Sequence, residues 1–199
     1  MSTTRIQIGP DDQGRTMALE EFREADEEPG YRYELARGGV LEVIEFPQTP
    51  HHRVVSQLFQ LAAIYGREHP GVIDYFGGGT EVRAWKPGMD LARHPDFGVV
   101  FHGTTRDEVG DLKAGLVAEV VSPSSKTRDY QDKRQDYLVY GVQEYWIVDP
   151  IQRQATVLTR QGEGADASWL ETVCRDADVI ESPALPGLRA TVDALWAGL

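Results

Sequence analysis

Residues 115–150 constrain the possible folds of this chain more than any other part of the sequence. An apolar strand is expected over residues 116–122, a polar helix over residues 127–140, and a short, fully apolar strand over residues 144–150 that stops at a proline. Strands before and after a helix in this order are typical of α/β proteins. The segment therefore predicts a β-sheet with helices on its faces.

The rest of the sequence adds helices and strands to this segment. Apolar residues at helical or alternating spacing indicate each one, with Gly- or Pro-bearing turns between them. The predicted helices are residues 16–28, 51–69 and 192–199, and the predicted strands are 31–46 (a hairpin turning at Gly38 and Gly39), 79–85, 96–101, 154–160 and 168–173. We predict the α/β class: a mixed β-sheet flanked by helices, with an N-terminal helix and hairpin and extra C-terminal strands.

Length and composition fit a single domain over residues 1–199, with residues 1–15 expected to be flexible. Of the 199 residues, 41% are hydrophobic, which is enough to fill one core. No stretch approaches the roughly 20 apolar residues of a membrane span, and the first residues lack the apolar segment of a secretory signal. Cys174 is the only cysteine, which excludes an intramolecular disulfide and fits a reducing compartment. We therefore expect a cytoplasmic protein without a membrane partner.

The formal net charge of −12 argues against a broad electrostatic surface for DNA or RNA, because phosphate contacts need Lys and Arg. Carboxylates gathered around a metal site would lower the net charge without covering the surface. The charge therefore counts against a nucleic-acid substrate but does not exclude one.

One acidic residue, Glu119, interrupts the apolar strand predicted over residues 116–122. A buried carboxylate must be hydrogen-bonded, protonated or bound to a cation, because its desolvation is costly. Asp96 follows a proline and opens the strand predicted over residues 96–101, so the two carboxylates can converge from adjacent strands. Oxygen ligands suit Mg²⁺ or Mn²⁺, with waters and a backbone carbonyl such as that of Val120 completing the shell.

The next predicted helix carries a lysine. Lys133 lies one turn after Asp129 and one turn before Tyr137, so the three residues share a face. An ammonium there could orient or activate a water at the metal. Simpler interpretations exist: Asp96 could cap a turn and Glu119 could pair with an arginine. Asp129 and Lys133 could be an ordinary solvated helix pair. Together, the residues favour metal-assisted hydrolysis of a phosphodiester.

Six segments of the chain resemble, in order, those of one protein family. They read YELARGG, HHRVVSQL, HPDFGVVF, VAEVVSPSS, DYQDKRQDYLVYGVQEYWIVDP and SPALPGLRATVDALW. The chain is similar, over nearly its whole length, to the Uma-two family of restriction endonucleases within the PD-(D/E)XK nuclease superfamily. The resemblance implies a restriction-endonuclease-like core, with Asp96 and Glu119 as metal ligands and a contribution from Glu34. It also implies Mg²⁺ or Mn²⁺ as cofactor and a nucleic acid, with DNA favoured, as substrate.

The chain departs from the superfamily pattern at one position. Val121 stands two residues after Glu119, where a lysine would complete the (D/E)XK triplet. The resemblance implies that Lys133, on the next helix, supplies the ammonium instead. Lys126, in the Ser-rich turn, is the weaker candidate because a loop side chain is less well held.

Two histidines open the helix predicted over residues 51–69. Adjacent helical positions point about 100° apart, so His51 and His52 cannot easily bind one ion together. His51 better matches the family pattern and is expected to face the site, whereas His52 is expected to cap the helix or lie on the surface. Periodicity places four aromatic residues in the core rather than on a base-stacking surface: Tyr137, Tyr140, Tyr145 and Trp146.

Three functions remain open. The first is a metal-dependent endonuclease with a site made by Glu34, Asp96, Glu119 and Lys133. The second is a catalytically inactive binding or assembly protein that keeps the nuclease fold, an alternative motivated by Val121 and by the net charge. The third is hydrolysis of a small phosphoester in a narrow pocket. We favour the endonuclease, and a homodimer would suit it because cutting both strands of a duplex needs two sites.

Overall fold

The computed structural model describes residues 5–45, 49–79, 82, 84–85, 88–104 and 113–197. The chain divides into two compact units, which are Met1–Pro47 with Trp85–Arg93 and Gln48–Ala84 with His94–Leu199. The organisation of residues 1–199 as one domain stays a prediction. None of the helices in these described ranges is long and apolar enough to cross a membrane.

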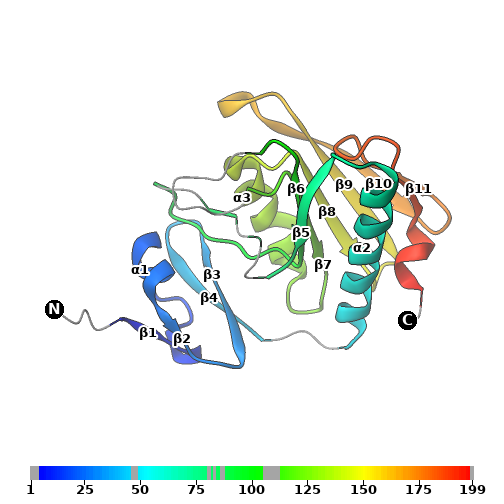
Figure 1. Cartoon of the computed structure of the whole chain (residues 1–199). Helices are drawn as coiled ribbons and strands as arrows, with labels where there is room; N and C mark the ends of the chain where they lie inside the picture. Colours follow the sequence, from blue (N-terminus) through cyan, green and yellow to red (C-terminus); the bar gives the residue numbers. More distant parts are fainter. Residues whose placement is uncertain are drawn as a thin grey trace. The chain divides into compact units, whose positions relative to one another are not determined.

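The first unit contains the predicted hairpin, which the structure confirms. Strands β3 (Tyr31–Ala36) and β4 (Val40–Glu45) pair in antiparallel register (Figure 1). The turn between them needs glycine: Gly38 and Gly39 have φ of 85° and 69°, values that other residues adopt at a cost. A Cβ on Gly39 would also lie only 2.4 Å from the carbonyl oxygen of Met17.

The helix predicted over residues 16–28 is wrong in extent. Helix α1 spans only Leu19–Glu24, and Ala25 leaves the helical region with ψ of 144°. The next residues form the short strand β2 (Asp26–Glu27), which pairs in parallel with β1 (Gln7–Ile8). Inter-strand hydrogen bonds thus replace the last helical turn, a non-local pairing that a local apolar period cannot indicate. A short 3-10 helix, η1 (Pro10–Asp12), lies between β1 and α1 in the chain.

The second unit is built on a six-stranded mixed sheet. The spatial order is β10-β9-β8-β7-β6-β5. Its strands are β5 (Ile73–Gly77), β6 (Phe97–Phe101), β7 (Leu116–Val120), β8 (Glu144–Asp149), β9 (Gln154–Gln161) and β10 (Ser168–Arg175). Among the described strands of this sheet, only β7 and β8 pair in parallel, because they are joined by a helical crossover rather than by a turn. The predicted α/β class with a mixed sheet is confirmed.

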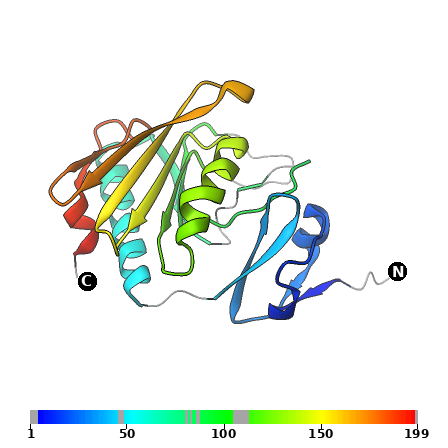
Figure 2. The same ribbon diagram turned by 180° about the vertical axis from the view of Figure 1, so that it is seen from behind.

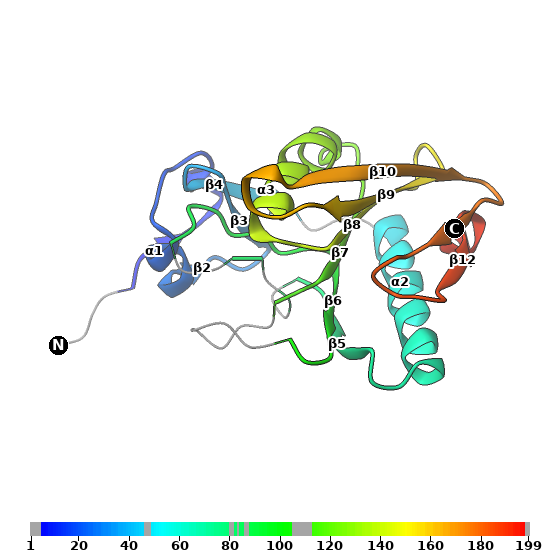
Figure 3. The ribbon, with the colours of Figure 1, turned by 90° about the horizontal axis from the view of Figure 1, so that it is seen from above.

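Two helices cover opposite faces of this sheet (Figures 2 and 3). Helix α2 (Thr49–Glu68) packs an apolar stripe against one face. The stripe consists of Val54, Leu58, Ala62 and Tyr65, all buried, with Leu61 partly buried. Helix α3 (Lys133–Tyr140) follows a π-helical turn, η2 (Arg128–Asp132), and ends at Gly141, which has a left-handed conformation. The predicted polar helix is therefore present on the other face, with a π-turn in its first half.

The remaining differences concern the strand before β6 and the C-terminus. Thr80, Glu81 and Arg83 of the strand predicted over residues 79–85 lie outside the described residues. Among the described residues, the sheet strand that precedes β6 in the chain is β5, which was not predicted. The predicted closing helix is a 3-10 helix, η4 (Val192–Trp196). The structure also contains η3 (Gly164–Asp166), β11 (Val179–Glu181) and β12 (Arg189–Thr191).

Candidate active site

Strand β7 carries Glu119 to the sheet face that α3 covers. Successive strand residues point to opposite faces, so Ala118 and Val120 enter the core cluster shared with α2 while Glu119 points away from it. Glu119 is nonetheless only 1% exposed. The alternation of side chains along β7 therefore places the Glu119 carboxylate on the sheet face that α3 covers.

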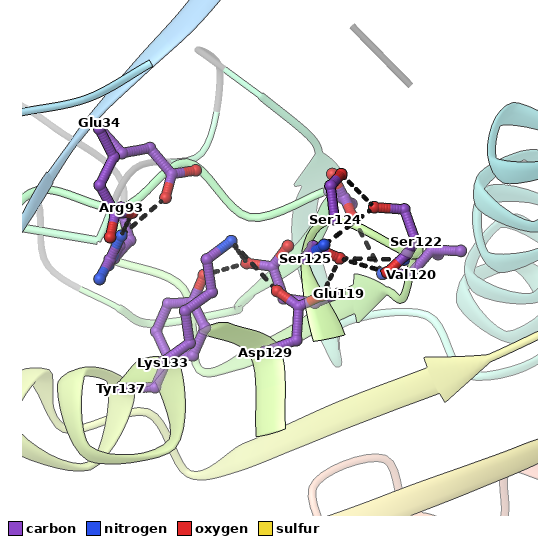
Figure 4. A network of polar contacts seen from close by, with 12 residues as sticks. Glu34, Arg93, Glu119, Val120, Ser122, Ser124, Ser125, Asp129, Lys133 and Tyr137 are labelled. Atoms are coloured by element: carbon purple, nitrogen blue, oxygen red, sulfur yellow. Dashed lines mark hydrogen bonds and ion pairs between the residues drawn. The ribbon is translucent and has the colours of Figure 1, made fainter. Parts of the chain in front are cut away.

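Lys133 forms an ion pair with the Glu119 carboxylate. Its Nζ lies 2.8 Å from Oε1 of Glu119 and 3.8 Å from Oδ1 of Asp129 (Figure 4). The hydroxyl of Tyr137 donates a hydrogen bond to the same Oε1 of Glu119. The predicted common face of Asp129, Lys133 and Tyr137 is thus confirmed. The alternative of a solvated helix pair is wrong, because the Lys133 and Asp129 side chains are 1% and 2% exposed.

The π-helical turn η2 contains Asp129 and ends directly before Lys133, so it sets the positions of both residues. The backbone N–H of Lys133 bonds to the carbonyl of Arg128, five residues earlier, and such widened turns frequently occur at functional sites. Ser125 donates its hydroxyl hydrogen to Asp129. Burial raises the pKa of the Asp129 carboxyl, the charge of Asp96 adds to this, and the Lys133 ammonium opposes it.

Asp96 lies where β6 begins, beside β7. Its Oδ2 accepts a hydrogen bond of 2.9 Å from the backbone N–H of Val120 on the neighbouring strand. Gly78 permits the close backbone approach that fixes this position, since a Cβ there would lie 2.3 Å from the carbonyl oxygen of Asp96. Asp96 is 8% exposed.

His51, at the start of α2, contacts the same two residues. Its Nε2 lies 3.5 Å from Oδ1 of Asp96, and its Nδ1 lies 3.1 Å from the carbonyl oxygen of Val120. His52 is exposed. His51 thus lies beside Asp96, and the expectation that His52 lies on the surface is confirmed. A role of His51 in the site stays a prediction.

Glu34 belongs to the first unit and has arginine partners there. It is fully buried, and Nη1 of Arg93 lies 3.2 Å from its Oε2 (Figure 4). Nε of Arg32 lies 3.6 Å from its Oε1. Arg93 also binds Glu42, the cross-strand partner of Glu34, and so offsets the repulsion between two carboxylates paired across strands. A role of Glu34 in the metal site stays a prediction.

The two lysine alternatives differ in environment. Val121, in the motif position, is buried and its N–H bonds to the carbonyl of Val148. Lys126 is exposed and lies in the helical residues directly before η2, after the Ser-rich turn. Lys133 contacts Glu119, in agreement with the arrangement that the resemblance implied, and its catalytic role stays a prediction.

The donor chemistry of this cluster fits a hard divalent cation. Asp96, Glu119 and Asp129 are buried carboxylates, and two of them, Glu119 and Asp129, lie beside the Lys133 ammonium. Carboxylate oxygens are the ligands that Mg²⁺ and Mn²⁺ prefer. Within the described part of the chain, no three His, Cys, Asp or Glu side chains already converge as a metal site. The structure thus supplies suitable ligands, without a preformed three-ligand arrangement.

Two contacts of the cluster were not predicted from the sequence, namely the hydrogen bonds of Tyr137 to Glu119 and of Ser125 to Asp129. Tyr137 was assigned to the core, which is correct, since its ring packs edge-to-face on Tyr145 at 4.9 Å between centroids. Tyr137 lies four residues after Lys133, and this helical spacing could have indicated that both side chains reach Glu119. For Ser125, the spacing of four residues from Asp129 was the only indication of the hydrogen bond between them. Tyr140, Tyr145 and Trp146 are buried as predicted.

Comparisons with known proteins agree with this architecture. A family model described as "Putative restriction endonuclease", Uma2, matches residues 19–193. A solved structure described as "a putative nuclease belonging to DUF820", from Anabaena variabilis, has the same fold, with a TM-score of 0.68 and 20% sequence identity over 91% of this chain and 98% of that chain. No curated protein matches the chain. The match to the family model covers most of the sequence, and the chain therefore belongs to the Uma2 family.

Proposed function

We propose that this protein is a metal-dependent endonuclease that hydrolyses phosphodiester bonds of DNA, with Mg²⁺ or Mn²⁺ as cofactor. The observation that carries the proposal is the 2.8 Å contact between Lys133 Nζ and Glu119 Oε1. It places an ammonium beside the strand carboxylate in a chain that has Val121 in the position of the motif lysine. The descriptions of the family and of the solved relative from Anabaena variabilis support the same class of activity.

In the proposed mechanism, Asp96 and Glu119 would hold the cation through their carboxylate oxygens. When bound, the ion acts as a Lewis acid on the phosphate and lowers the pKa of water. Lys133 stabilises the negative charge that develops on the attacking water or on the phosphate. Tyr137 holds the Glu119 carboxylate in place through its hydroxyl. Burial of these groups strengthens each interaction, because the local dielectric constant is low.

The proposal extends to the setting of the reaction. We place the activity on DNA in the cytoplasm, and we propose a homodimer because two strand cuts need two sites. The net charge of −12 limits non-specific attraction to phosphates, so binding should depend on a few local contacts rather than on a basic surface.

The test is cleavage of plasmid and single-stranded DNA by the full chain, with Mg²⁺ or Mn²⁺ and with a chelator. We expect cutting that needs the metal and is lost in Asp96→Asn. A small phosphodiester, offered in parallel, distinguishes a narrow phosphoesterase site from a nuclease. No cleavage of any substrate with either metal would contradict the proposal and favour the catalytically inactive binding protein.

Glu34 is tested separately. If it contributes a ligand or holds a water near the ion, Glu34→Gln should lower Mn²⁺ affinity in calorimetry. Unchanged affinity would contradict a role of Glu34 at the metal and would favour a structural role in its ion pairs with Arg32 and Arg93.

A further inference from the structure

We propose that His51 is a ligand of the divalent cation through Nε2, beside Asp96, and that this nitrogen gives the site a preference for Mn²⁺ over Mg²⁺. The inference rests on the metal dependence in the proposed function and goes beyond its carboxylate ligands. It is drawn from the contacts that His51 makes with Asp96 and with the backbone of Val120.

The first step is the position of the imidazole proton. Nδ1 of His51 lies 3.1 Å from the carbonyl oxygen of Val120. A carbonyl oxygen can only accept a hydrogen bond, so Nδ1 must carry the proton. In the neutral ring, Nε2 then carries the lone pair. Metal-binding histidines commonly donate their second N–H to a backbone carbonyl in this way, which fixes the tautomer and the ring orientation.

The second step is what Nε2 faces. Oδ1 of Asp96 lies 3.5 Å away, so in the neutral ring a nitrogen that carries a lone pair lies next to a carboxylate oxygen. Two acceptors in this arrangement repel unless a positive species lies between them, either a proton on Nε2 or a metal ion. Two ligands bound at about 2.1 Å to one ion can be at most about 4.2 Å apart. The observed separation is within that limit.

The third step is how the two candidate ligands are held. The N–H of Val120 binds Oδ2 of Asp96, and the carbonyl of the same residue accepts the hydrogen bond from His51. One residue of β7 therefore orients both side chains. His51 is held in the first turn of the 20-residue helix α2, and sites on regular elements are better fixed than sites on loops.

A nitrogen ligand changes which metal the site favours. Carboxylate, carbonyl and water oxygens suit Mg²⁺ and Mn²⁺ alike, whereas imidazole suits transition metals. Loss of His51 should therefore weaken Mn²⁺ binding more than Mg²⁺ binding. The competing interpretation is an imidazolium–carboxylate ion pair between His51 and Asp96, which predicts no bond from nitrogen to the metal.

The deciding experiment is pulsed electron paramagnetic resonance of the full chain loaded with Mn²⁺, which detects an imidazole nitrogen bound to the ion by its hyperfine coupling. We expect nitrogen coupling in the unsubstituted chain and its loss in His51→Gln, together with at least a roughly 10-fold fall in Mn²⁺ affinity by calorimetry. His52→Gln is the matched control, because His52 is the exposed neighbour on the same helix, and it should retain both properties.

The outcomes separate this inference from the proposed function. Bound Mn²⁺ without nitrogen coupling in the unsubstituted chain overturns the role of His51, whether or not DNA is cut, and so does coupling that survives in His51→Gln. A chain that binds no Mn²⁺ overturns both proposals. Nitrogen coupling that depends on His51, in a chain that cuts no DNA, would support the ligand and contradict the nuclease.

Discussion

Replacement of Lys133 by methionine tests the centre of the proposed site. Methionine keeps most of the apolar stem and removes the ammonium, so the effect reports on charge rather than on a cavity. At 2.8 Å from Glu119, the Coulomb attraction at an effective dielectric constant of about 20 is about 6 kcal/mol. Removing one member of a buried ion pair costs about 3–5 kcal/mol in measured cases. We expect a loss of unfolding free energy within that second range.

The same substitution should separate metal binding from chemistry. A protonated ammonium has no lone pair for a cation, so Mn²⁺ should still bind to Lys133→Met and should recover part of the lost stability by binding only the native state. Cleavage should fall by about 10²-fold or more, because an electrostatic contact to the reacting groups is missing.

The assay combines urea unfolding, with and without Mn²⁺, and DNA cleavage at saturating metal. Lys126→Met is the matched control, since Lys126 is exposed and its substitution should change stability by less than about 0.5 kcal/mol. Cleavage that survives in Lys133→Met but not in Lys126→Met would transfer the role to Lys126. Cleavage that survives both changes would refute the participation of either lysine, and a stability loss below about 0.5 kcal/mol would refute the argument from the buried ion pair.

Three further predictions follow from other contacts. Tyr137→Phe removes the hydrogen bond to Glu119 but keeps the aromatic ring, so it should cost about 1.5–3 kcal/mol in urea unfolding and reduce cleavage less than Lys133→Met does. Millimolar Mn²⁺ should raise the melting temperature of the unsubstituted chain, since ligand at 100 times its dissociation constant adds about 2.7 kcal/mol, and it should leave Asp96→Asn unchanged; equal shifts would remove Asp96 from the site. Burial raises the pKa of Glu144 above 4.5, so its stabilising contribution is fully present below that pH and is lost as the pH rises through the folded-state pKa. In Glu144→Gln, the free energy of unfolding should fall less steeply between about pH 4 and pH 8. An unchanged pH dependence of that free energy would contradict a raised pKa of Glu144.

The sequence by itself determined the elements whose information is local. The apolar alternation of β7 and β8 and the stripe of α2 predicted these elements, and Gly38 and Gly39 predicted the hairpin turn because its φ angles require glycine. The same periodicities placed Asp129, Lys133 and Tyr137 on one helix face, and the break in an apolar strand singled out Glu119. These residues could be found because helix and strand repeats fix the direction of each side chain.

Only the tertiary structure decided which distant groups meet. The contact of Lys133 with Glu119 depends on how α3 packs on the sheet, and the contacts of His51 depend on how α2 meets the ends of β6 and β7. The shorter α1 likewise results from pairing between β1 and β2. Local spacing sets the direction in which a side chain points, but the partner that it finds depends on strand register and helix packing between segments far apart in the chain.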